Sequence, residues 1–121
     1  MSDWSHRHVA YIAGLGTFGR HHMLITEDGC CGRLNSLVTD AVVAPTPRPK
    51  TEACLYKAGG SCRACATRCP VEVLGETSFD RRACYSVCLE NAARHADLGL
   101  ADVCGKCACA VPCSFTNPNS G

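Results

Sequence analysis

The chain has 121 residues, and its 12 basic and 11 acidic side chains give a formal net charge of +1, which excludes a broad electrostatic attraction for nucleic acid or an anionic membrane. Aromatic residues make up only 6% of the sequence, whereas 12 residues are cysteine, so we expect a small core that bound metal helps to stabilise. No apolar run approaches the ~20 residues that cross a bilayer, and the polar start MSDWSHRH has no signal-peptide pattern, which predicts a cytoplasmic protein without membrane partners.

The first expected element is a short helix over residues 6–14, HRHVAYIAG. Val9, Ile12 and Ala13 have the i, i+3, i+4 spacing of one helix face, and Gly14 suits the helix end.

A β-hairpin is expected next. Residues 22–26, HMLIT, read as a strand, and residues 27–29, Glu-Asp-Gly, read as a turn. Residues 34–43, LNSLVTDAVV, read as the second strand of the hairpin.

A proline-rich segment over residues 41–50, AVVAPTPRPK, continues neither a helix nor a central strand, so we expect an extended connector. It divides the chain into a glycine-loop and hairpin region, residues 1–50, and a cysteine-rich domain, residues 51–121. Within the second region, residues 82–96 look helical, with Asp80 as the N-cap.

The first cysteine group is Cys54-x7-Cys62-x2-Cys65-x3-Cys69-Pro70. Its end, C-x2-C-x3-C-P, matches the end of the bacterial ferredoxin pattern, in which the cysteine before proline ligates the other cluster. The second group comprises Cys104, Cys107, Cys109 and Cys113, and Cys84 and Cys88 lie between the two groups.

Two [4Fe–4S] clusters need eight thiolates, and the crossed ferredoxin arrangement assigns them. The first cluster takes Cys54, Cys62, Cys65 and Cys113, and the second takes Cys69, Cys84, Cys104 and Cys107. Cys88 lies four residues after Cys84 on the same face of the expected helix, so it is an alternative ligand to Cys84.

Zinc is the main alternative to clusters. The pairs Cys62/Cys65 and Cys104/Cys107 could form one four-thiolate site of a zinc-stabilised interaction domain, although their separation exceeds the usual zinc spacing. That site would leave Cys54, Cys69, Cys84 and Cys113 unexplained. A disulfide framework is disfavoured, because thiols stay reduced in the cytosol.

The first half resembles the segment that precedes the clusters in epoxyqueuosine reductases and reductive dehalogenases. The resemblance rests on Ala13–Gly16, Phe18–Gly19, Leu24–Thr26, Gly29, Leu34 and Thr39–Asp40. Downstream, Cys69-Pro70, the Asp-Arg-Arg-x-Cys of residues 80–84 and the late C-x2-C at Cys104 follow in the family order. The resemblance covers most of the chain.

The resemblance implies two [4Fe–4S] clusters and a corrinoid, cobalamin, with Gly14, Leu15 and Gly16 lying against it. The implied reaction is reduction of a modified tRNA nucleoside or another small electrophile, so a nucleic-acid partner follows only if that function holds. Family members carry an N-terminal domain for the corrinoid and substrate that this sequence lacks, so we expect either a fragment or a chain that works with another subunit. The usual lysine after Phe-Gly is Arg20 here.

Three weaker patterns are interpreted as structural rather than functional. Gly14-x-Gly16-x-x-Gly19 matches the dinucleotide fingerprint, but a strand rather than a helix is expected after it, so we read a tight turn. His6, His8, His21 and His22 match no ligand spacing and are expected to be solvent-exposed or hydrogen-bonded. Cys30 and Cys31 are adjacent, which disfavours a mutual disulfide, so they are read as turn residues.

The sequence thus predicts an α+β protein in which a hairpin and helix precede a two-cluster ferredoxin-like module. The expected function is one-electron transfer between a donor protein and an acceptor, and no catalytic acid or base stands out. If the chain is an enzyme, it is an oxidoreductase of the epoxyqueuosine reductase kind.

Overall fold

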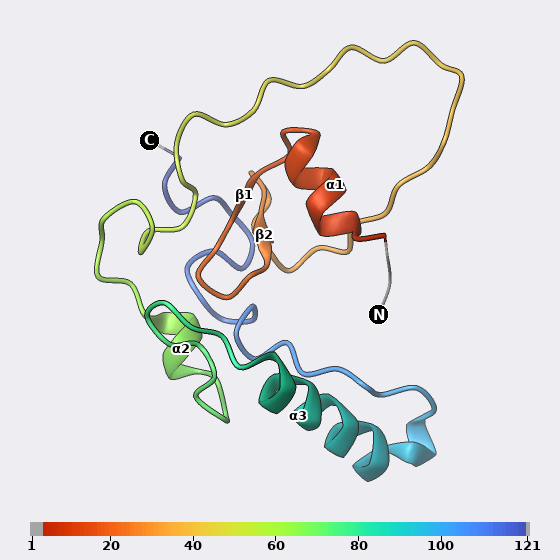
Figure 1. Cartoon of the computed structure of the whole chain (residues 1–121), viewed down its shortest axis with the longest axis vertical. Helices are drawn as coiled ribbons and strands as arrows, with labels where there is room; N and C mark the ends of the chain where they lie inside the picture. The colour runs from red at the N-terminus through yellow and green to blue at the C-terminus, as the bar shows by residue number, and fades with distance from the viewer. Residues whose placement is uncertain (1–3, 121) are drawn as a thin grey trace.

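The computed structural model describes residues 4–120 and consists of short elements joined by long irregular segments (Figure 1). The elements are, in chain order, α1 (His6–Ile12), β1 (Thr17–Phe18), β2 (Leu24–Ile25), α2 (Ala64–Thr67), α3 (Arg81–Arg94) and the 3-10 helix η1 (Ala96–Leu98). Within the described residues, β1 and β2 form one two-stranded antiparallel sheet. This small mixed architecture is compatible with the predicted α+β class.

The helix α1 confirms the element expected over residues 6–14. It ends at Ile12, and Gly14 follows with a φ of +81°, a left-handed conformation that glycine adopts easily after a helix end. The predicted apolar face is wrong, because the buried residue of α1 is Ala10, whereas Ile12 is 64% exposed. The short helix turns its small residue toward the hairpin and leaves the larger one in solvent.

The hairpin differs from the predicted one in its partner strand. β2 lies within the expected strand at residues 22–26, but β1 pairs with it, with Thr17 opposite Ile25 and Phe18 opposite Leu24. A tight turn allows this pairing, since the Gly19 N–H donates to the carbonyl of Met23 at 2.9 Å. Residues 34–43 instead form an irregular, mostly exposed loop.

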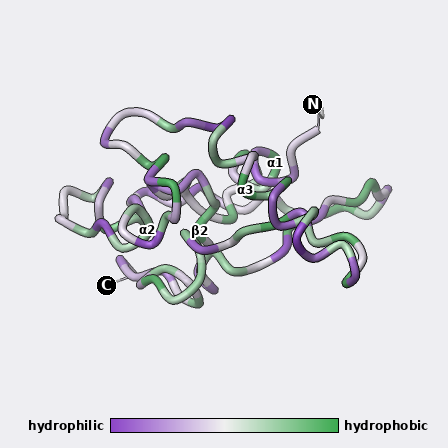
Figure 2. Tube along the Cα trace, turned by 90° about the horizontal axis from the view of Figure 1, so that it is seen from below, coloured by the Kyte–Doolittle hydropathy of each residue, from purple (hydrophilic) through white to green (hydrophobic). Residues whose placement is uncertain are grey.

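The connector at residues 41–50 is irregular and exposed, as its prolines predict. It belongs to the long outer loop in Figure 1, and its residues Thr46 and Pro47 approach Gly14 just after α1. Figure 2 shows hydrophobic stretches in such outlying segments as well as beside β2. The apolar residues of this chain are therefore not gathered into one central core.

The helix α3 confirms the element expected over residues 82–96 and its N-cap. A side-chain oxygen of Asp80 accepts hydrogen bonds from the backbone N–H groups of Arg82 and Ala83, each at 3.0 Å. No residue of α3 is fully buried. The helix is attached to the rest of the protein through Ala83 and Cys84, which pack against a small apolar cluster.

The buried residues form two small clusters, and cysteines belong to both. The first contains Ile25, Cys30, Ala53, Cys54 and Ala108. The second contains Cys65, Val73, Leu74 and Val111. Cys113 packs against both clusters, so it lies where the hairpin region meets the cysteine-rich region.

The predicted turn at residues 27–29 is confirmed and has a close neighbour. Thr26 and Gly29 exchange two backbone hydrogen bonds, and Gly29 has a φ of +85°. A Cβ atom at Gly29 would lie 2.5 Å from the carbonyl oxygen of Ser114, a separation that packed atoms do not tolerate. The turn therefore needs glycine both for its conformation and for its approach to the C-terminal segment.

This approach places the residues after the turn in register with the C-terminal segment. The backbone N–H of Cys30 donates to the carbonyl of Cys113 at 2.8 Å, and that of Cys31 donates to the carbonyl of Ser114 at 3.0 Å. Segments more than 80 positions apart in the sequence are thereby held together by main-chain bonds.

Gly29→Ala is expected to destabilise the protein by more than about 1–3 kcal/mol, the cost of unfavourable backbone conformation alone, because the new methyl group also collides with Ser114. Gly99→Ala is the matched control, since Gly99 has a φ of +82° and open space around its Cβ position. Urea unfolding of both variants measures the difference. Equal losses of unfolding free energy would contradict the close packing at Gly29.

Candidate metal centre

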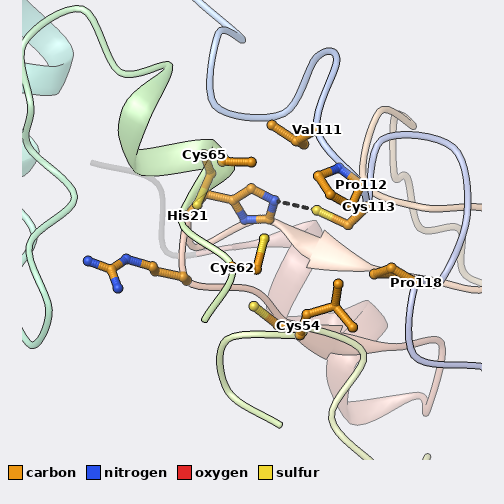
Figure 3. Close-up of a pocket in the computed structure, with 11 residues that line it drawn as sticks. His21, Cys54, Cys62, Cys65, Val111, Pro112, Cys113 and Pro118 are labelled. Carbon is orange, nitrogen blue, oxygen red and sulfur yellow. Dashed lines mark hydrogen bonds between the residues drawn. The ribbon is translucent and has the colours of Figure 1, made fainter. Parts of the chain in front are cut away.

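Four cysteines line one pocket between the hairpin region and α2. They are Cys54, Cys62, Cys65 and Cys113. Figure 3 shows the four side chains around the same space, with Cys62 and Cys65 from one segment, Cys54 and Cys113 from others, and His21 among them. This is the set that the sequence assigned to the first cluster.

Local structure explains how these cysteines reach the pocket. Cys54 follows Ala53, whose buried N–H donates to the hydroxyl of Thr17 in β1 at 2.9 Å, so the hairpin fixes the start of the cysteine-rich region. Cys65 lies in α2 and is buried, and Cys62 precedes that helix. The two-residue spacing brings both thiols to the pocket from a single tight segment.

The remaining lining of this pocket is mostly apolar. It comes from Leu55, Ala64, Val111, Pro112 and Pro118. Thiolates in apolar surroundings are poorly solvated, and burial duly raises the pKa of the Cys65 thiol, with the nearby Cys54 adding to the rise. A positive centre in the pocket would compensate the charge that burial disfavours at Cys65.

Arg20 supplies one positive charge at the edge of the pocket. The residue is buried, and its Nη2 donates to the carbonyls of Leu74 and Gly75 at 3.2 and 2.9 Å. Its guanidinium also lies over the ring of Tyr56, with 4.2 Å from Cζ to the ring centroid. Among residues 4–120, Nε and Nη1 of Arg20 are the buried side-chain nitrogens without a hydrogen-bond partner. A buried cation with spare N–H groups suits a site that holds several thiolates.

The second set of predicted ligands lies around the start of α3. Burial first, and then the neighbouring Cys88, Cys69 and Cys104, raise the pKa of Cys84. Burial and Cys84 are likewise the leading causes that raise the pKa of Cys107 to about 11. Cys69, Cys84 and Cys107 also pack against the same apolar cluster. The structure thus brings Cys69, Cys84, Cys104 and Cys107 into one neighbourhood.

Cys88 has fewer such contacts than Cys84. Its thiol faces the carbonyl of Cys84 one turn earlier, and burial, Cys104 and Asp102 raise its pKa. Cys88 does not pack against the apolar cluster that Cys84 contacts. The contacts favour Cys84 over Cys88 as the fourth member of this set.

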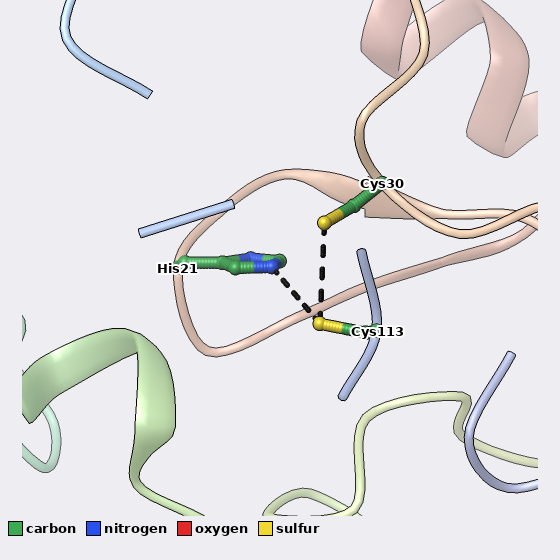
Figure 4. Close-up of side chains that lie close together, drawn as sticks. All are labelled: His21, Cys30 and Cys113. Carbon is green, nitrogen blue, oxygen red and sulfur yellow. Dashed lines mark hydrogen bonds between the residues drawn. The ribbon is translucent and has the colours of Figure 1, made fainter. Parts of the chain in front are cut away.

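A third group of ligand-type side chains lies beside the first pocket (Figure 4). It consists of His21, Cys30 and Cys113, whose ligand atoms all lie within 4.8 Å of one another. The sulfur of Cys113 is 3.9 Å from that of Cys30 and 3.4 Å from Nε2 of His21. Tetrahedral zinc with bonds of ~2.3 Å to sulfur and ~2.0 Å to nitrogen places its ligand atoms at similar separations. The group and the abundance of cysteine suggest that this protein binds metal.

The other ring nitrogen of His21 is already engaged. The backbone N–H of Met23 points at Nδ1 of His21 at 3.2 Å, so Nδ1 acts as the acceptor. In a neutral imidazole the proton is then on Nε2, which donates it to the sulfur of Cys113. This hydrogen bond favours a thiolate at Cys113, and a metal ion at Nε2 would first require the Met23 contact to be broken.

The pKa values of the two thiols in this group move in opposite directions. Donation from Cys30, and then from His21, lowers the pKa of Cys113 to about 5 despite its burial. The same hydrogen bond and burial raise the pKa of Cys30, which retains the shared proton. Cys113 is therefore the thiol of this chain best prepared to act as an anionic ligand.

The sequence did not reveal the roles of His21 and Cys30. The sequence predicts a solvent-exposed or hydrogen-bonded His21, and it is a buried hydrogen-bonding residue. The sequence predicts an ordinary turn residue at Cys30, which is also buried. The group joins residues up to 92 positions apart, so no local spacing could have indicated it.

The glycine loop is covered by the chain itself. A Cβ atom at Gly14 would meet the carbonyl of Thr46 at 2.8 Å, and one at Gly16 would approach the carbonyl of Ile25 even more closely. Leu15 between them is 48% exposed. A strand, β1, follows the loop, as expected for a tight turn rather than a dinucleotide site.

Comparison with known proteins adds no identification. The sequence matches no protein-family model, no curated protein and no solved structure. None of the helices within residues 4–120 has the length and apolar character needed to cross a bilayer.

In the metal-free chain, Cys113 is expected to react with iodoacetamide as a thiolate down to about pH 5, since Cys30 and His21 donate to its sulfur. Cys107, with its pKa raised to about 11, is the internal control and should react only in strong alkali. Peptide mass spectrometry of alkylation against pH measures both.

The sign of the linked stability follows from the same shift. The folded-state pKa of Cys113 lies below its ordinary value of 9.0, so its stabilising contribution is complete above pH 9 and is lost as the pH falls through about 5. Cys30→Ala should move the alkylation midpoint of Cys113 upward. A midpoint near 9 in the unaltered chain would show that the two hydrogen bonds are absent.

Proposed function

We propose that this protein transfers electrons through two [4Fe–4S] clusters held in a ferredoxin-like module, and that it resembles the cluster-bearing part of epoxyqueuosine reductases. The observation that carries the proposal is the pocket lined by Cys54, Cys62, Cys65 and Cys113. Three of these cysteines come from the first sequence group and one from the far end of the chain. That combination is the crossed ligand set of two-cluster ferredoxins.

The second set of cysteines supports the same arrangement. Cys69 stands before Pro70 in the first sequence group, yet it lies near Cys84, whose other neighbours include Cys104. The cysteine before proline therefore leaves its own group and joins the other one, as the crossed arrangement requires. Two such exchanges, one by Cys69 and one by Cys113, are hard to reconcile with a single zinc ion.

The single-zinc alternative needs Cys62, Cys65, Cys104 and Cys107 around one ion. Cys62 lines the first pocket with Cys54, whereas Cys104 is a neighbour of Cys84 and Cys88. Cys65 and Cys107 do adjoin the same apolar cluster, and Cys65 contributes to the raised pKa of Cys107. Cys62 and Cys104 belong to different neighbourhoods, however, which disfavours one ion held by all four thiolates.

When bound, iron–sulfur clusters supply one-electron chemistry, and the protein sets their reduction potentials. The chain would hold the first cluster through the four pocket thiolates, exclude water with Val111 and Pro112, and offset negative charge with Arg20. His21 would donate its Nε2 proton to the sulfur of Cys113. Hydrogen bonds and positive charge near the sulfurs favour the reduced state, which carries one more negative charge.

A corrinoid-dependent reductase acting on a modified tRNA nucleoside or other small electrophile is the enzyme form of this proposal. It rests on the family resemblance of Gly14, Leu15 and Gly16, and the close packing of Gly14 and Gly16 against the chain's own backbone favours the simpler electron-transfer function. Adding cobalamin to the anaerobic protein separates the two, because a bound corrinoid changes the cobalamin spectrum.

Protein purified without oxygen is expected to contain about eight iron and eight sulfide per chain, with brown absorbance that bleaches on reduction. Cys62→Ser should lower both to about four, because it removes one ligand of the first pocket only. Cys88→Ser is the matched control and should leave both unchanged. Zinc without sulfide would refute the proposal.

Arg20→Met is expected to lower the reduction potential of the first cluster, because the buried positive charge beside the pocket is lost. Arg20→Lys keeps the charge and should retain most of the potential, although it loses the stacking on Tyr56. A redox titration followed by electron paramagnetic resonance measures both variants. Identical potentials in Arg20→Met and the unaltered protein would sink the assigned role of Arg20.

A further inference from the structure

Two cysteines outside both ligand sets lie next to each other at the surface. The sulfurs of Cys31 and Cys109 are 4.0 Å apart, although 78 positions separate the residues in the sequence. Cys109 is exposed and Cys31 is partly buried. Neither residue lines the four-cysteine pocket, and neither was assigned to a cluster.

We propose that Cys31 and Cys109 form a reversible thiol–disulfide pair that exchanges with small disulfides of the glutathione type. Adjacent Cys30 and Cys31 cannot easily bond to each other, but the turn at Gly29 presents Cys31 to a different segment. The bond would join the hairpin region to the C-terminal segment that carries Cys107 and Cys113.

Two hydrogen bonds hold Cys31 against the segment that carries Cys109. The N–H of Cys31 donates to Ser114, and its thiol donates to the carbonyl of Ala108 at 3.0 Å, one residue before Cys109. Sulfur atoms at 4.0 Å need to approach to ~2.05 Å, which rotation of the two side chains can supply.

The difference in exposure between the two thiols determines which of them reacts first. The exposed thiolate of Cys109 attacks glutathione disulfide, forming a mixed disulfide and releasing one glutathione thiolate, which takes up a proton. The thiolate of Cys31 then attacks the sulfur of Cys109 and releases the second glutathione. In total, two protein thiols lose two protons and two electrons, and one glutathione disulfide becomes two glutathione molecules.

The neighbouring pair Cys30 and Cys113 is almost as close, at 3.9 Å, but it differs in access. Cys30 is only 4% exposed, so a small disulfide cannot reach its sulfur from solvent. Cys113 is also a proposed cluster ligand. The exchangeable pair is therefore Cys31 and Cys109.

The test maps disulfides in the full chain, purified without oxygen and then incubated anaerobically with glutathione disulfide. We expect the loss of two reactive thiols and the appearance of one disulfide between the peptides that contain Cys31 and Cys109. Dithiothreitol should reverse both changes. Cys31→Ser and Cys109→Ser should each abolish the link, with Cys109→Ser also preventing the first mixed disulfide. Cys88→Ser, a spare cysteine distant from this pair, should leave the link intact.

Three outcomes would overturn the proposal: no protein disulfide, glutathione that stays attached to Cys109, or a link between other cysteines such as Cys30 and Cys113. Iron and sulfide measured on the same samples keep the result separate from the proposed function. A chain that lacks iron yet forms the Cys31–Cys109 link refutes the cluster assignment alone, and a chain with full iron and no link refutes the disulfide alone.

Discussion

The main-chain contact between the turn at Gly29 and the segment around Ser114 determines most of the architecture of the candidate site. It joins the hairpin region to the end of the chain through two short hydrogen bonds and leaves no space for a side chain at the glycine. Cys113 is fixed by this contact, beside Cys30 and within the four-cysteine pocket that His21 also lines. Without it, the first ligand set would lose the member that comes from the far end of the chain.

Electrostatics disfavour ionised cysteines at the metal-free site. Burial and neighbouring sulfurs raise the pKa values of Cys65, Cys84 and Cys107, so these thiols resist ionisation when no metal is bound. Cys113 is the exception, because two donors stabilise its anion. Binding of a cationic centre would therefore supply folding free energy, which fits a chain with two small apolar clusters in place of one large core.

Local patterns in the sequence predicted the helix that begins after Asp80, the turn at Gly29 and the extended connector, because each depends on residues close together in the chain. The partner of β2 was predicted wrongly: residues 34–43 have strand-like composition, but the tight turn after Gly19 returns Leu24 and Ile25 to Thr17 and Phe18. Composition alone could not show which of the two segments pairs with β2.

The same division applies to the site. Spacing near proline predicted which cysteines belong together, and the pocket gathers the four of the first set, yet the identity of the bound group stays a prediction. The donation of His21 to Cys113 and the pairing of Cys31 with Cys109 span 92 and 78 positions. Such long-range contacts follow from how the turn meets the C-terminal segment, which no motif encodes.

Few contacts attach α3 to the rest of the protein, so its helical content should respond to binding at Cys84. This helix of 14 residues buries no side chain fully and meets the rest of the protein mainly through Ala83 and Cys84. Helices of this length are marginal in water unless tertiary contacts support them. The helical signal of the whole chain, to which α3 contributes the largest share, should therefore rise and fall with whatever holds the sulfur of Cys84, so circular dichroism could follow loading of the proposed second site without any coloured probe.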